Sequence, residues 1–228
     1  MKKTNKLNRF RAGLVCLSAM LVSPIALSET FNEAVLKAHN VLRALHQNTL
    51  SLTSDATLSK EAQAWAEHLL ATGTLKHSSS DQRSGAGENL YFASQSNQTF
   101  SQAQIDWIKQ NYPGMKIPAP FTMVNLAYAA VHAWYEELEN YDYQTGSSTN
   151  GQVIGHFTQV VWKGATKFSC GAAHKTEGEM VKAYVVCRYA PAGNVRGQYT
   201  ANVLPRKPGA VTPKIYELNP AIPEYVYN

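Results

Sequence analysis

The order of the hydrophobic patterns along this chain is the feature that most constrains its fold. Apolar residues recur at spacings of three and four in three early segments, which predicts helices over residues 29–47, 59–72 and 124–139. After residue 150 the pattern changes to short apolar segments of β-type composition, separated by turns that contain lysine and glycine. This change predicts antiparallel strands, at residues 156–162, 168–174 and 180–190.

Helices that precede a small sheet indicate the α+β class. The third expected strand is continuously apolar over residues 184–186, which is typical of a strand covered on both faces. We therefore expect a three-layer α-β-α sandwich with a small antiparallel sheet. In the second helix, Ser59 is expected as the N-cap and Gly73 as the stop.

The connections between these elements are polar or rich in proline. Residues 77–89 and most of residues 93–121 are expected to be loops, with a short helix over residues 105–112. The prolines of residues 206–228 predict an extended tail, which leaves residues 29–205 as one domain.

The first 28 residues have the layout of a secretory signal peptide. A basic stretch is followed by an apolar run, and the small residues Ala26 and Ser28 stand at the −3 and −1 positions of a cleavage site. The alternative is an uncleaved membrane anchor, but the apolar run is short for a membrane span. No later segment is long and apolar enough to span a bilayer. We expect the mature protein to be secreted or periplasmic.

The net charge of the mature chain argues against a nucleic-acid partner. The formal charge of the whole chain is +5, and five of its 21 lysines and arginines lie in the first 28 residues, which hold no acidic residue. Removal of the signal leaves 16 basic residues against 16 acidic ones. A nucleic-acid partner therefore loses its main support from composition.

Two cysteines, Cys170 and Cys187, remain once Cys16 leaves with the signal. Export exposes them to an oxidising compartment, which favours a disulfide between them. They fall on neighbouring expected strands, where a cross-strand bridge is geometrically plausible. The alternative is a pair of reduced, buried thiols.

Histidines and carboxylates are the remaining candidates for chemistry, since the chain has no phosphate-binding loop and no serine-hydrolase or zinc-protease motif. Four of them lie in loops or at the ends of expected elements, namely His77, Glu88, Glu137 and His156. Imidazoles can ligate a divalent metal, and carboxylates can complete its shell or activate a water. The alternative is a buried His–Glu hydrogen-bond network that fixes the loops.

Two longer motifs, GHFTQVVWKGAT (155–166) and YVVCRYAPAGNV (184–195), resemble the signatures of the cysteine-rich secretory protein, antigen 5 and pathogenesis-related superfamily, also called the CAP or SCP domain. HNVLR (39–43), GENL (87–90) and WYEE (134–137) match as well and follow in the family's order. The resemblance covers roughly residues 31–205. The lysine-rich signal indicates a bacterial-type secreted member.

The resemblance implies an α-β-α sandwich and a cleft lined by two histidines and two glutamates. By motif match these are His77, Glu88, Glu137 and His156, and in several members the histidines hold zinc or a similar ion. The family has no agreed general activity: proteolysis has been proposed for some members, and sterol or fatty-acid binding for others. His39 and Arg43 also match a family motif, and we interpret them as structural anchors.

The long segment between GENL and the third helix departs from the family pattern. An aromatic, proline-containing loop in this region is linked to lipid binding in the family. The candidate lipid-binding residues are Phe100, Trp107, Tyr112 and Phe121. The alternative is that these rings only cover the enlarged loop.

We therefore predict an exported binding protein whose His/Glu cleft holds a divalent metal, with zinc as the expected ion, and which binds a lipid or sterol, or an envelope or host protein. The alternative is a metal-dependent, protease-like hydrolase, in which Glu88 or Glu137 activates a water. A binding role is favoured over an enzymatic one.

Overall fold

The computed structural model describes residues 29–219 except residues 116 and 118. The expected signal peptide and the last nine residues of the expected tail lie outside the described residues. In the described part, no helix is long and apolar enough to cross a membrane.

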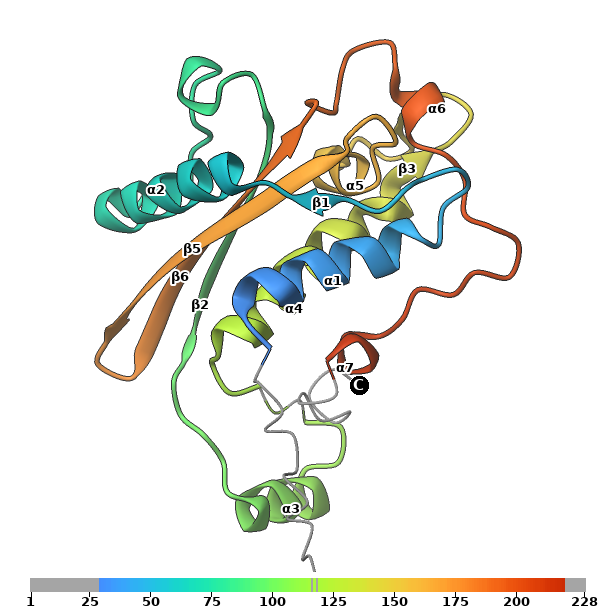
Figure 1. Cartoon of the computed structure of the whole chain (residues 1–228). Coiled ribbons are helices and arrows are strands. Elements are labelled where there is room, and N and C mark those ends of the chain that lie inside the picture. The colour runs from blue at the N-terminus through green and yellow to red at the C-terminus, as the bar shows by residue number, and fades with distance from the viewer. Residues whose placement is uncertain (1–28, 116, 118, 220–228) are drawn as a thin grey trace, which may run out of the picture.

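The four-stranded sheet has the order β1-β5-β6-β2 (Figure 1). Strands β5 (Lys167–Glu177) and β6 (Met180–Ala190) form an antiparallel hairpin, and β2 (Gly87–Ser96) pairs with β6 along its whole length. The short strand β1 (Thr53–Ser54) adds to β5 in the parallel direction. The expectation of a purely antiparallel sheet is therefore wrong at this edge, where the incoming chain makes only two residue pairs before α2 begins.

Helices cover both faces of the sheet, which confirms the three-layer α-β-α sandwich (Figure 1). Helices α1 (Phe31–Arg43) and α4 (Met123–Glu136) pack on one face and enclose the larger apolar core. Helix α2 (Ala56–Thr72) packs on the other face over a smaller cluster that includes Leu90 and Val186. The sheet is thus buried between two apolar layers, as the continuous apolar run of β6 predicts.

Two expected elements are different in the structure. The segment predicted as a strand over residues 156–162 is instead the short helix α5 (Gly155–Val160). The edge strand β2 covers residues 87–96, of which 87–89 and 93–96 were expected to be loop. Sequence patterns do not distinguish a short apolar strand from a short buried helix. In this case the first turn of α5 is stabilised by the carboxylate of Glu137, which accepts the backbone N–H groups of His156 and Phe157.

The ends of α2 are set by Asp55 and Gly73. Asp55 is the N-cap, and its side chain accepts the N–H groups of Thr57 and Leu58, so the expected cap at Ser59 is wrong. Gly73 adopts the left-handed conformation that ends the helix, as predicted. The remaining elements are short: η1 (Asp81–Arg83), α3 (Gln102–Asn111), η2 (Glu137–Asn140), β3 (Tyr141–Asp142), β4 (Ser147–Ser148), α6 (Tyr199–Asn202) and α7 (Ile215–Leu218).

The chain after residue 205 continues to pack on the domain. The backbone of Arg206 bridges to His46, and Ile215 and Leu218 of α7 are buried in the larger core. The proline-rich segment therefore contains core residues at least as far as Leu218, in addition to the extended stretches that its prolines predict.

The expected disulfide joins Cys170 of β5 to Cys187 of β6, which are directly opposed in the sheet. Their Cα atoms are 4.1 Å apart, which is typical of a pair that does not exchange backbone hydrogen bonds. The bridge lies in the larger core, on the face covered by α1 and α4.

Two fully buried histidines, His39 and His46, tie helix α1 and the chain after it to the rest of the fold. His39 Nδ1 donates to the Val35 carbonyl at 2.8 Å, and its Nε2 accepts from the Tyr189 hydroxyl at 2.8 Å. His46 makes the same pattern with the Leu204 carbonyl and the Tyr135 hydroxyl. Burial lowers the pKa of His39 to about 3 and that of His46 to about 4, so both rings are neutral at pH 7. This supports the interpretation of His39 as an anchor.

These two neutral histidines should make the fold sensitive to acid. Below an ordinary histidine pKa of about 6.5, these two histidines become protonated in the unfolded chain but stay neutral in the folded chain. The free energy of unfolding therefore falls as the pH drops from about 6.5 towards 4. Each ring contributes a slope of about 1.4 kcal/mol per pH unit in this window. We expect His46→Gln to reduce the slope measured by urea unfolding between pH 7 and 4.5. The exposed His174→Gln is the control, and equal slopes for the two variants would contradict the prediction.

Candidate functional site

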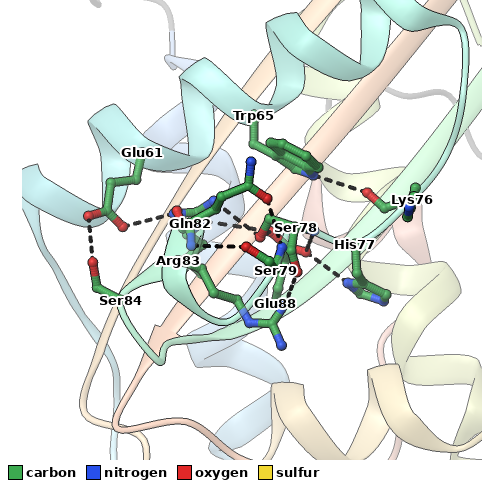
Figure 2. Close-up of polar contacts among 11 residues, drawn as sticks. Glu61, Trp65, Lys76, His77, Ser78, Ser79, Gln82, Arg83, Ser84 and Glu88 are labelled. Atoms are coloured by element: carbon green, nitrogen blue, oxygen red, sulfur yellow. Dashed lines mark hydrogen bonds and ion pairs between the residues drawn. The ribbon is translucent and has the colours of Figure 1, made fainter.

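The first His–Glu pair forms where strand β2 begins. Glu88 is the second residue of β2, and its side chain is 1% exposed. Its Oε1 accepts a hydrogen bond from His77 Nδ1 at 2.8 Å and one from the Ser78 backbone N–H at 3.0 Å, and its Oε2 accepts one from the Ser78 hydroxyl at 2.7 Å (Figure 2). His77 itself is 54% exposed. A buried carboxylate thus holds an imidazole that remains open to solvent.

A buried arginine stabilises this carboxylate. Arg188 lies directly opposite Glu88 in the β2–β6 register and is 1% exposed. Its Nε lies 3.6 Å from Glu88 Oε2, and its Nη1 donates to Glu61 Oε2 at 2.8 Å. Burial alone would raise the pKa of Glu88, but the hydrogen bonds from His77 and Ser78 outweigh burial and lower it. Glu88 is therefore a carboxylate at neutral pH.

The second pair joins the end of helix α4 to the start of helix α5. Glu137 follows the last residue of α4, and its Oε1 accepts from His156 Nδ1 at 2.6 Å. Its Oε2 accepts the backbone N–H of His156 at 2.9 Å and that of Phe157 at 3.2 Å. The ring of His156 stacks on Trp134 with a centroid distance of 6.3 Å. Position and orientation of this imidazole are therefore both fixed.

The beginning of β2 lies between the two pairs. Glu88 belongs to the first pair, and the next residue, Asn89, donates to the backbone carbonyl of His156 at 3.1 Å. Leu90 accepts the indole N–H of Trp134, the residue on which His156 stacks. The structure thus brings all four residues predicted from sequence to one end of one strand, as two separate His–Glu pairs.

The hydrogen bonds define the tautomer that each of the two imidazoles adopts when it is neutral. A carboxylate can only accept, so the proton of each neutral ring lies on Nδ1, and Nε2 keeps a lone pair. This tautomer is the one in which a histidine can ligate a metal through Nε2. Within residues 29–219, apart from the two that are not described, no group of three or more histidine, cysteine, aspartate or glutamate side chains is placed to hold a metal ion.

A polar cavity of about 330 Å³ adjoins the first pair. It is lined by His77, Glu88 and Arg83, by glycines of two loops, and by Gln159 of α5. Sequence reasoning missed Gln159 and Arg188 as parts of the site. Gln159 lies in the first signature motif and Arg188 in the second. The motifs alone do not show where either side chain lies relative to β2, so neither residue could be placed in the site.

The four aromatic residues proposed for lipid binding fall into two groups. Trp107 and Tyr112 lie on and after helix α3, are 56% and 53% exposed, and contact each other edge to face. Phe121 packs partly buried against the larger core and contacts His174. It lines a cavity of about 150 Å³ between β2 and the start of α4. Phe100 is half-buried in the loop before α3.

Comparison with known proteins identifies the family. The model of the CAP family, described as the cysteine-rich secretory protein family, matches residues 36–189. This range contains both His–Glu pairs, the disulfide and most of the sandwich. The chain belongs to the CAP family.

Individual relatives agree with this assignment. The human Golgi-associated plant pathogenesis-related protein 1 is 36% identical over 182 residues, which cover 79% of this chain and 96% of that protein. Protein PRY2 of Saccharomyces cerevisiae is 33% identical over 77% of this chain and 41% of its own length. Cysteine-rich secretory protein 3 of the horse is 32% identical over 75% of this chain and 59% of its own length. These relatives are eukaryotic, and the bacterial type expected from the signal stays a prediction.

Solved structures agree on the fold. The crystal structure of NaASP2 with Zn²⁺ matches with a TM-score of 0.52 at 24% identity, over 81% of this chain and 90% of that chain. The venom allergen-like protein 4 of Schistosoma mansoni matches with a TM-score of 0.51 at 17% identity, over 80% of this chain and 97% of that one.

The buried charge cluster around Arg188 gives a prediction about stability. We expect Arg188→Met to lower the free energy of unfolding by roughly 3–5 kcal/mol, because it leaves Glu61 and Glu88 without their buried cation. The matched control is Lys182→Met, which breaks the exposed pair with Glu177 and should leave stability nearly unchanged. Urea unfolding at pH 7 measures both, and similar small losses would contradict the prediction.

Proposed function

We propose that this protein is an exported CAP-domain binding protein whose cleft holds a divalent metal through His77 and His156. The observation that carries the proposal is the shared geometry of the two histidines: each is bonded at Nδ1 by a carboxylate and keeps Nε2 for another partner. Metal-binding histidines almost always donate their second ring N–H to a carboxylate or carbonyl in this way.

The carboxylates fit a supporting role better than a catalytic one. Glu88 is buried, and both its oxygens accept hydrogen bonds from His77 and Ser78. Both oxygens of Glu137 are likewise engaged by the ring and the backbone of α5. A general base needs an oxygen that can take a proton from water. These contacts support the binding role over the hydrolase alternative.

Zinc suits the donor set, because neutral imidazole is one of its preferred ligands. Two histidines are fewer than the four positions that zinc usually fills, so the remaining positions would be taken by water or by groups of a bound ligand. When bound, the ion would supply a Lewis-acidic point for a ligand oxygen. The fold neighbour NaASP2, whose structure is described with Zn²⁺, supports this choice of ion.

Export is supported by the N-terminal sequence and by the names of relatives. Residues 1–28 have the layout of a signal peptide. Relatives are named as secretory or secreted proteins in the horse and in Candida albicans. The disulfide also suits an oxidising compartment.

The metal proposal predicts the result of a calorimetric titration of Zn²⁺ into the folded protein. We expect micromolar or tighter binding, which is lost in the double variant His77→Ala/His156→Ala. The control is His174→Ala, which removes an exposed histidine of β5 outside the site. Equal binding by the site variant and the wild type, or no binding by either, would contradict the proposal.

Lipid binding is a second candidate function, and the exposure of apolar side chains around α3 favours it. Trp107, Tyr112 and Met115 are each more than half exposed and lie within nine residues of one another. Soluble proteins rarely gather large apolar side chains on the surface without a binding role. Tryptophan and tyrosine are also the residues that membrane interfaces favour.

The lipid candidate predicts co-sedimentation with phosphatidylglycerol–phosphatidylcholine vesicles. Trp107→Ser/Tyr112→Ser should abolish it without changing the affinity for Zn²⁺. Leu75→Ser/Val211→Ser, which removes two exposed apolar residues elsewhere, should leave it intact. Vesicles with and without cholesterol separate a general lipid surface from a sterol site. If the α3 variant still sediments with vesicles, the candidate is wrong. A protein partner would then become the first alternative for this surface.

A further inference from the structure

The amide group of Gln159 is a buried polar group in the cleft whose bonding is incomplete, and Arg188 Nε, 3.6 Å from Glu88 Oε2, is another. Gln159 is 1% exposed and lines the polar cavity beside His77. Its Oε1 accepts the backbone N–H of Gly193 at 3.1 Å, which fixes which end of the amide is oxygen. Its Nε2 is buried and has no hydrogen-bond partner among the described residues. A buried donor without a hydrogen-bond partner lowers the free energy of unfolding by about 1–3 kcal/mol. The presence of such a donor at Gln159 therefore needs an explanation.

Two glycines pack closely against the amide of Gln159. The Cα atoms of Gly87 and Gly193 lie against the Gln159 carboxamide, and a Cβ on Gly193 would lie 2.7 Å from Nε2. A Cβ on Gly87 would overlap Oε1. Neither glycine has a positive φ, so the close approach of the amide, and not the local turn, requires glycine at these two positions.

The cavity that Gln159 lines combines a cation with an unpaired amide donor. Arg83 contributes the guanidinium, whose Nη1 also donates to the Ser78 carbonyl, and Gln159 contributes Nε2. Glu88 is the carboxylate of this lining, but its side chain is 1% exposed and its oxygens are already bonded to His77 and Ser78. Such a cavity, of about 330 Å³, favours a small ligand group that accepts hydrogen bonds and carries negative charge.

We propose that this cavity binds the carboxylate group of a ligand, with Gln159 Nε2 as the donor that recognises one carboxylate oxygen and Arg83 as the compensating cation. The inference rests on the proposed binding role of the cleft and names the class of ligand that the cleft takes. A site that offers a buried donor rejects groups that lack an acceptor, because the donor then stays unpaired. Gln159 thereby determines specificity and is not a metal ligand.

The test uses sodium acetate as the probe and metal-free, ¹⁵N-labelled protein. We expect the side-chain amide signals of Gln159 to shift saturably with acetate. Sodium chloride at the same ionic strength and neutral N-methylacetamide should not produce this shift. No saturable shift with acetate would overturn the inference. An equal response to N-methylacetamide would overturn the carboxylate class.

Two variants keep the test informative if one folds poorly. Gln159→Met removes the donor, and Gln159→Glu keeps the acceptor for Gly193 while replacing the donor with an oxygen. Both should weaken acetate binding at least tenfold, and Arg83→Gln should weaken it as well. Gln198→Met, at an exposed position, is the matched control. Unchanged acetate binding in folded Gln159 variants would overturn the inference.

The Zn²⁺ titration separates this inference from the proposed metal role. The Gln159 variants should bind Zn²⁺ as the wild type does, because their histidines are intact. Acetate binding without Zn²⁺ binding would leave the carboxylate site standing and refute the metal role. Zn²⁺ binding without acetate binding would leave the metal role standing and refute the carboxylate site.

Discussion

Much of the sandwich depends on the hydrogen bonds that the guanidinium of Arg43 donates. Arg43 is fully buried at the end of α1, and burial lowers its pKa to about 10, which leaves it charged at neutral pH. Arginine suits this position because its planar group donates in several directions at once, which lysine cannot match. The group donates to four backbone carbonyls, at Leu50, Val160, Trp162 and Ala165. Three of these carbonyls come at or just after the end of α5, so α1 holds in place the helix that carries His156 and Gln159.

Alternation along β2 explains how one strand supports both halves of the cleft. Successive side chains of a strand point to opposite faces. Glu88 therefore points to the α2 face, where it meets His77 and Arg188, while Asn89 points to the α4 face and bonds His156. Resemblance to the family predicted the histidines and glutamates. It did not predict Arg188, because its pairing with Glu88 follows from the strand register, which arises only when β2 and β6 meet.

The sequence predicts those parts of the fold whose signal is local. The helical periods of α1, α2 and α4, the β5–β6 hairpin and its disulfide all follow from patterns within one segment or two adjacent ones. Helix α5 was missed because its apolar run is too short to show a period, and its start is stabilised by the distant Glu137. Strand β2 was missed because it is a half-exposed edge strand with small and polar residues, and its pairing partner lies about ninety residues away.

The position of β2 also separates the two surfaces to which function is assigned. The strand begins at the cleft with Gly87 and ends at Ser96, shortly before α3, which lies far from α2 and the cleft loops (Figure 1). Ten residues of strand span about 30 Å. A ligand at the exposed rings of α3 therefore cannot directly touch the histidines that are proposed to bind a metal. Occupation of one surface could affect the other through a change in β2 or α4, and β2 is paired to β6 along its entire length. The two binding activities should accordingly be separable by substitution, and a measured coupling between them would point to movement of α4, whose ends reach both regions.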